Sequence, residues 1–169
     1  GGRQGGRSGG GYEPDMIHAG DAGYRRGAKQ TADPRRRAHR LPITTEPDVA
    51  EFDRDASSYI PFEEIDRNSA EFRAIVTGDY TAIGGPDPKT FVGKIIDAMD
   101  RIISAHPSET VAVVCHAGVI NAYMAHVLGI DRVIFFGPGY TSINRVLASN
   151  STGMRGVGSL NELAHLLSV

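Results

Sequence analysis

A histidine follows a strongly apolar run in the second half of the chain and precedes a predicted helix. The run Thr110–Cys115 is continuous and rich in valine, which is typical of a strand buried on both faces of a sheet, and Val119–Leu128 reads as a helix. Open α/β sheets bind ligands at the carboxyl ends of their strands, and the free N–H groups of a following helix favour an anion. His116-Ala117-Gly118 therefore predicts an anion site where the two small residues let a phosphate approach. The alternative is that His116 only caps the helix.

The helices and strands that must position this histidine can be predicted from the second half of the sequence. Residues 88–105 carry a wide apolar stripe at helical spacing, with Asp87 as the expected N-cap and His106-Pro107 as the end. Further strands are predicted at Val133–Phe136 and Tyr140–Ala148, the latter in a hairpin with Met154–Gly158. Helices that alternate with buried strands predict an α/β fold, a three-layer α/β/α sandwich with a mostly parallel sheet.

The first half is less regular. Residues 1–11 contain seven glycines and are expected to be a linker that is flexible or poorly determined. A short strand is predicted at residues 14–18 and an edge strand at residues 41–45, where Pro42 cannot donate to a ladder. The acidic stretch 46–61 predicts a surface loop. Helical spacing follows over residues 62–76, and we expect the whole of 1–169 to form one domain.

Composition limits the class of protein. An apolar content of 40% and a charged content of 22% are ordinary for a soluble domain, and no apolar run approaches the ~20 residues that cross a bilayer. One cysteine and no apolar leader fit the cytoplasm. Nine basic against four acidic side chains in residues 1–40 suit an anion pocket better than nucleic acid, because aromatics are not interleaved with them. Without an H-x-x-x-H or C-x-x-C pair, no metal or other cofactor is expected.

Residues 88–167 resemble the C-terminal half of the histidine phosphatase superfamily, also called phosphoglycerate-mutase-like. The resemblance lies in ordered blocks: HPSET, VAVVCHAGVINAYMAHVLGI, YTSINRV and SLNELAHL. It implies the phosphoglycerate-mutase-like fold. It also implies that His116 is the second histidine of the family's pocket, which contacts the transferred phosphoryl group and stabilises its charge.

Two upstream stretches extend the resemblance. HAGDAGYRRGAKQTAD is similar to the family segment in which an arginine that clamps phosphate precedes a Q-T-A helix, so Arg25 or Arg26 would bind phosphate. The alternative is two exposed arginines on a helix. VAEFD is similar to the family's leucine-x-glutamate step, which makes Glu51 the candidate general acid/base and Asp53 the second choice. The alternative for Glu51 is a surface role.

The main departure concerns the nucleophile. The family begins with a strand that ends in Arg-His-Gly, whose histidine becomes a phosphohistidine, and this tripeptide does not occur in the sequence. We expect that the sequence begins after that strand; His18 in His18-Ala19-Gly20 is a weaker substitute.

The resemblance implies a metal-independent phosphatase of small-molecule phosphate monoesters. The alternatives are phosphoryl transfer of the phosphoglycerate mutase type and a non-catalytic phosphate-binding module. No nucleic-acid or membrane partner is expected, and a homodimer is left open.

Overall fold

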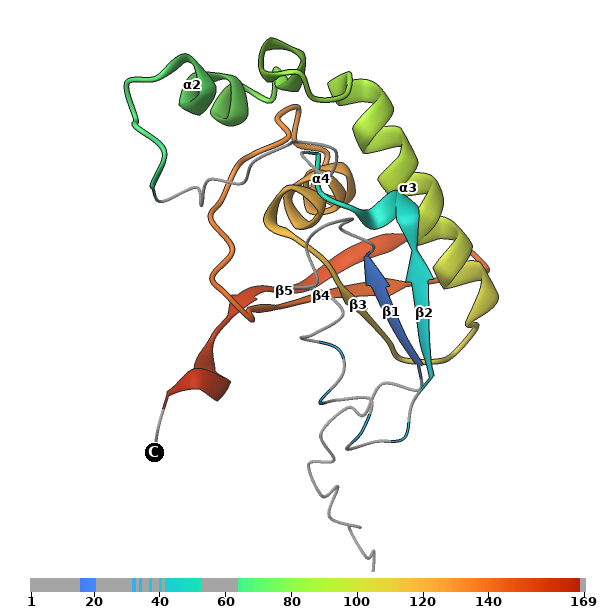
Figure 1. Ribbon diagram of the computed structural model, residues 1–169. Helices are drawn as coiled ribbons and strands as arrows, with labels where there is room; N and C mark the ends of the chain where they lie inside the picture. The colour runs from blue at the N-terminus through green and yellow to red at the C-terminus, as the bar shows by residue number, and fades with distance from the viewer. Residues whose placement is uncertain are drawn as a thin grey trace, which may run out of the picture.

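Three parallel strands and an antiparallel hairpin make up the β-structure of the computed structural model (Figure 1). The model describes residues 16–20 by their backbone, positions 32, 34, 37 and 40, and residues 42–52 and 64–167. Strand β1 (Met16–Gly20) lies between β2 (Ile43–Glu46) and β3 (Val111–Val114), and both pairings are parallel. The predicted strands at 14–18, 41–45 and 110–115 are thus confirmed to within two residues, with β2 at an edge as expected.

The helices of the second half begin and end within two residues of their predicted bounds, with α4 (Ala117–Leu128) starting at Ala117 instead of Val119. Helix α3 (Pro88–Ala105) starts after Asp87, whose Oδ2 accepts the Thr90 N–H at 2.8 Å, and ends at His106. Helix α4 ends at Gly129, whose φ of 67° lies in the left-handed region that glycine adopts without strain. Helix α2 (Ala70–Thr77) is shorter than the helical spacing over 62–76 predicted, because Ser69 caps it and accepts the N–H of Phe72.

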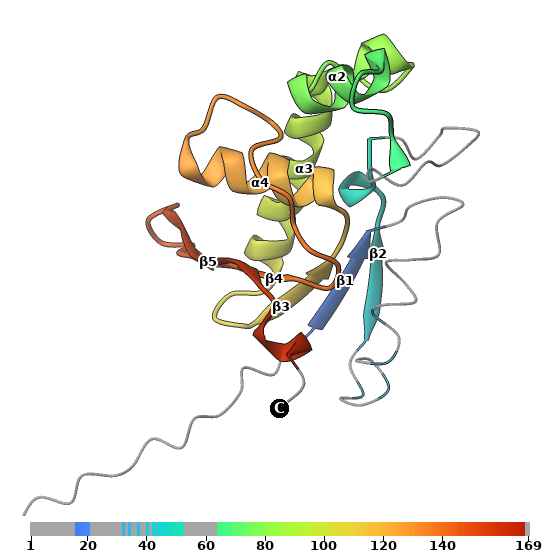
Figure 2. The same cartoon turned by 90° about the vertical axis from the view of Figure 1, so that its left-hand side faces the viewer.

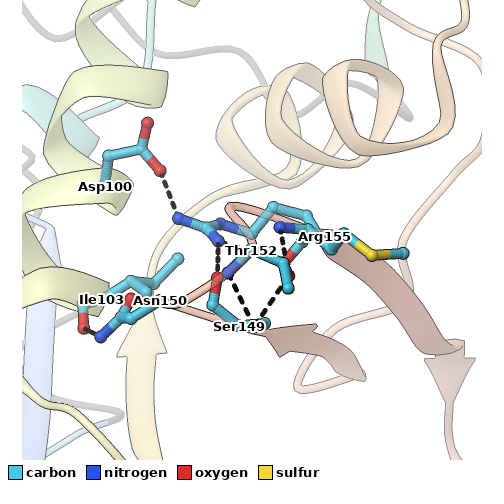
Figure 3. Close-up of polar contacts among 7 residues, drawn as sticks. Asp100, Ile103, Ser149, Asn150, Thr152 and Arg155 are labelled. Atoms are coloured by element: carbon cyan, nitrogen blue, oxygen red, sulfur yellow. Dashed lines mark hydrogen bonds and ion pairs between the residues drawn. The ribbon is translucent and has the colours of Figure 1, made fainter.

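The predicted hairpin is confirmed. Strand β4 (Ile143–Ala148) pairs antiparallel with β5 (Arg155–Glu162), which runs four residues beyond the predicted end at Gly158. Figure 3 shows how the turn is tied to α3: Arg155 Nη2 lies 3.0 Å from Asp100 Oδ1, and Asn150 donates to the carbonyl of Ile103 at 3.3 Å.

The predicted strand at Val133–Phe136 is wrong. Residues 133–136 run close to α4 as an irregular loop, and their backbone groups bond to one side chain instead of to a ladder. Asn121 is 1% exposed; its Oδ1 accepts the N–H groups of Phe135 and Phe136, and its Nδ2 donates to the carbonyls of Ala117 and Phe136. A buried amide that uses its acceptor twice and both donor hydrogens satisfies the loop locally, so no partner strand is needed.

Apolar side chains on β3 alternate between two faces. Val113 and Cys115 pack against the core cluster that contains α3 and α4, whereas Ala112 and Val114 pack with Ile43 against the buried Ala32. Packing on both faces of the parallel strands confirms the α/β class. The three-layer sandwich over the whole chain stays a prediction, because Ala32 belongs to a segment of which only isolated positions are described.

The two sheets share one core although they do not pair with each other. Val146 of β4 packs against the same cluster as Val113 and Cys115 of β3. In Figure 2 the hairpin lies on the β3 side of the parallel strands, away from β2. Among the described strands β3 pairs only with β1, so its edge toward the hairpin has no strand partner. None of the described helices is long and apolar enough to span a bilayer.

Candidate phosphate site

The candidate site lies where β3 ends and α4 begins. His116 has an extended backbone, with φ −117° and ψ 169°, and stands at the N-cap position of α4. Its side chain makes no capping bond to the helix, so the interpretation of His116 as only a cap does not hold. The imidazole is half-buried and its Nε2 atom lies beneath the surface. The predicted position of His116, at the carboxyl end of a parallel strand and at a helix N-terminus, is confirmed.

Glu51 reaches the same helix N-terminus from a distant part of the chain. Its Oε2 accepts the N–H of Gly118 at 2.9 Å, although the two residues are 67 positions apart. Its Oε1 accepts the N–H of Phe52 at 3.1 Å. Glu51 is 7% exposed, which rules out the alternative of a surface role. A carboxylate therefore occupies the end of α4 at which the sequence predicts an anion.

Gly118 is required by this contact. An ideal Cβ on Gly118 would collide with the carboxylate of Glu51 and would come within 3.1 Å of Phe52 Cδ1. The sequence predicted that a small residue at position 118 would let a phosphate approach. In the structure, the space beside Gly118 is occupied by the Glu51 side chain. Ala117 is exposed at the first position of α4, so that side of the helix end is open.

A short 3₁₀ turn, η1 (Pro47–Val49), brings Glu51 to the site. Val49 is 0% exposed and anchors the turn in the core. On the exposed side of this turn, Arg101 of α3 forms salt bridges with two carboxylates, with Nη2 at 3.2 Å from Glu46 Oε1 and 2.9 Å from Asp48 Oδ2. The predicted surface loop is therefore wrong for residues 49–51, which are buried because the apolar side chain of Val49 draws the chain inward.

Aromatic rings form the wall beside Glu51. Phe52 stacks on Tyr80 of the 3₁₀ turn η3 (Tyr80–Ile83), with ring centroids 4.2 Å apart and planes 2° from parallel. Phe91 meets Tyr80 edge to face at 5.6 Å. Burial, and then the charge of Glu51, raise the pKa of Cys115 to about 12, so this thiol stays neutral and unreactive at physiological pH.

Several predicted site residues cannot be placed. Arg25, Arg26 and Asp53 lie outside the described residues. His18 is described by its backbone alone, which lies opposite Val113 in the β1–β3 register. Since Val113 precedes His116 by three residues, the backbone of His18 lies about 10 Å from the level of His116 along the strands. This position does not favour His18 as the substitute nucleophile.

Two features of the site were missed from the sequence. Asn121 stands in the largely apolar helix GVINAYMAHVL, and a lone amide on a buried face was a signal that it pairs with backbone. Tyr80 gave no comparable signal, because aromatic residues in irregular segments are common. Among the residues described, no group of three His, Cys, Asp or Glu side chains could hold a metal ion.

Comparison with known proteins defines the family. Residues 22–154 match the family model of the histidine phosphatase superfamily, branch 1. The match covers most of the chain, which therefore belongs to the histidine phosphatase superfamily.

Solved structures share the fold at low sequence identity. YhfR of Bacillus stearothermophilus superposes with a TM-score of 0.74 at 20% identity, over 92% of this chain and 77% of its own. The phosphoserine phosphatase of Entamoeba histolytica, solved with 3-phosphoglyceric acid, gives 0.67 at 16% identity over 92% and 77%. A mycobacterial glucosyl-3-phosphoglycerate phosphatase, solved with VO₃, gives 0.68 at 20% identity over 88% and 76%. No curated protein sequence matches the chain.

Proposed function

We propose that this protein is a metal-independent phosphatase that hydrolyses small phosphate monoesters through a phosphohistidine intermediate. The observation that carries the proposal is the meeting of His116, the N-terminus of α4 and the buried Glu51 carboxylate at the carboxyl end of β3. An imidazole and helix N–H groups stabilise a phosphoryl group, and a carboxyl group can deliver a proton to its leaving oxygen. The phosphatases among the solved structures of this fold support the same class of reaction.

The roles follow from the geometry and from the family. The phosphoryl oxygens would bind at the end of α4 with His116, and Arg25 or Arg26 would complete the clamp. Glu51 would protonate the departing alkoxide as the bond between phosphorus and the leaving oxygen breaks. It would then take a proton from the water that hydrolyses the phosphohistidine. Since the Glu51 carboxylate lies on Gly118, a bound phosphate would compete with it for the N–H of Gly118.

The nucleophilic histidine of this mechanism has no counterpart in an Arg-His-Gly tripeptide of the sequence. We propose that it belongs on a strand paired with the free edge of β3, between β3 and the hairpin. Two observations support this place: the described sheets share one core without pairing, and the edge ends beside His116. A strand there would present its last residues to the same helix N-terminus.

A non-catalytic phosphate-binding module is the second candidate. The specific observation in its favour is that the tripeptide is missing, since the fold would then retain an anion site without a nucleophile. Phosphoryl transfer of the mutase type also requires that the product be retained and phosphorylated again, and no described residue serves that purpose.

Hydrolysis of p-nitrophenyl phosphate tests the proposal, with and without EDTA. The proposal predicts turnover that EDTA does not inhibit, and an acid-labile phosphoenzyme. It also predicts a loss of about 10²–10⁴-fold in kcat in Glu51→Gln and a comparable loss in His116→Ala. Turnover that EDTA abolishes would contradict it. Saturable phosphate binding without turnover would favour the binding module.

A further inference from the structure

The hydroxyl group of Tyr80 has no function in the packing of the core. Tyr80 is 0% exposed, and its Oη has no hydrogen-bond partner among the residues that the structure describes. Its ring is held by the stack on Phe52 and the edge contact with Phe91, and a phenylalanine would make both contacts equally well. A buried hydroxyl without a partner destabilises a fold. This group is therefore unfavourable in the ligand-free protein unless another state uses it.

Tyr80 is connected to the contact between Glu51 and Gly118 through the ring of Phe52. Phe52, on which it stacks, follows Glu51 in the chain and borders the Cβ position of Gly118 at 3.1 Å. Burial, and then the charge of Glu51, raise the pKa of Tyr80, so the carboxylate is within electrostatic reach of the phenol. Within the described part of the chain, the charge of Glu51 also raises the pKa of Cys115 at the end of β3, and His116 follows Cys115 at the N-cap of α4.

We propose that Tyr80 is a positioning residue whose hydroxyl holds the Glu51 carboxyl group when a bound anion takes the N–H of Gly118. The inference rests on the proposed function, in which an anion binds at that helix end. The carboxylate now accepts hydrogen bonds from Gly118 and Phe52. An anion competes for the Gly118 N–H, because one N–H makes one strong bond. The displaced carboxylate oxygen can then accept from the phenol of Tyr80, a buried donor that has no other partner among the described residues.

The test follows the Glu51 carboxyl group by ¹³C NMR in the full chain labelled at glutamate Cδ. Sulfate is the probe, because it keeps the same charge throughout the titration, and the signal of Glu51 is assigned by its loss in Glu51→Gln. With saturating sulfate, we expect the pH midpoint of this signal in Tyr80→Phe to lie about one pH unit above wild type, a tenfold change in proton affinity. Without sulfate, the two midpoints should agree.

Tyr123→Phe is the matched control. Tyr123 is also a buried tyrosine, 4% exposed, but it lies on α4 with Arg155 and Asp100 instead of Glu51 as its charged neighbours. We expect this variant to titrate as wild type does, so that loss of any buried hydroxyl is excluded as the cause. Thermal unfolding of all three proteins confirms that each is folded.

The possible failures are distinguishable. If sulfate shifts the amide signal of Gly118 and Glu51 still titrates identically in wild type and Tyr80→Phe, the role of Tyr80 is wrong and the anion site stands. If sulfate leaves the Gly118 amide unchanged in wild type, the anion site of the proposed function is wrong, and the role of Tyr80 with it.

Discussion

At the scale of single residues, the site depends on a carboxylate that reaches a helix end through a glycine. Glu51 accepts the N–H of Gly118 inside a buried contact that leaves no space for a Cβ. This arrangement places a buried carboxylate at the helix end that follows His116, on the N–H group for which phosphate would compete in the proposed function. If the proposed function holds, the same two residues determine both local stability and anion binding.

Gly118→Ala tests this contact. The new methyl group would collide with the Glu51 carboxylate and crowd Phe52, so we expect a loss of about 1–3 kcal/mol in the free energy of unfolding. Chemical denaturation measures this change. Gly93→Ala is the control, because its added Cβ meets nothing within 4 Å in the middle of α3, and we expect a gain of about 0.5–1 kcal/mol there. Equal stability of the two variants would contradict this description of the site.

At the scale of elements, local signals predicted what local forces determine. The bounds of α3 follow from Asp87 and His106-Pro107, and α4 and the hairpin were found from composition and turn residues. The loop at 133–136 was misassigned because its hydrogen bonds go to Asn121, more than ten positions earlier in the chain. The contact between Glu51 and Gly118 could be suspected only through family resemblance, because no local pattern joins residues 67 positions apart.

Asn121→Ala tests the attachment of this loop to α4. The substitution leaves the N–H groups of Phe135 and Phe136 without their acceptor, so we expect a loss of about 2–4 kcal/mol in the free energy of unfolding. Amide hydrogen exchange of residues 133–136 should accelerate as well. Asn150→Ala removes one exposed bond to Ile103 and should cost less than about 1 kcal/mol. A loop that remains protected in Asn121→Ala would show that its order has another cause.

At the scale of the whole molecule, the described strands form two sheets on one core. The weakly acidic side chains of Tyr80 and Cys115 pack in that core. Burial is the larger cause, ahead of the Glu51 charge, of the raised pKa of both Tyr80 and Cys115. Each group therefore stays protonated in the folded chain at a pH where the unfolded chain ionises. Ionisation then favours the unfolded chain, so the stability present at neutral pH is lost as the pH rises.

We expect the free energy of unfolding to fall once the pH exceeds the ordinary values of 9.0 for cysteine and 10.0 for tyrosine. Urea denaturation at neutral pH and at about pH 10.5 measures the decline. Tyr80→Phe should reduce it, whereas Tyr140→Phe, at a side chain that is 75% exposed, should not. A stability that stays constant to about pH 11 would contradict the burial of these groups.

The most direct test of the central claim is a titration of the ¹⁵N-labelled protein with inorganic phosphate, followed at the Gly118 amide. The account predicts a saturable shift of this signal and of its neighbour Ala117, which His116→Ala abolishes or weakens by at least about tenfold. This result does not depend on whether the nucleophile is present. Phosphate binding that leaves the Gly118 amide unperturbed, or no binding at all, would contradict a phosphate site at the start of α4.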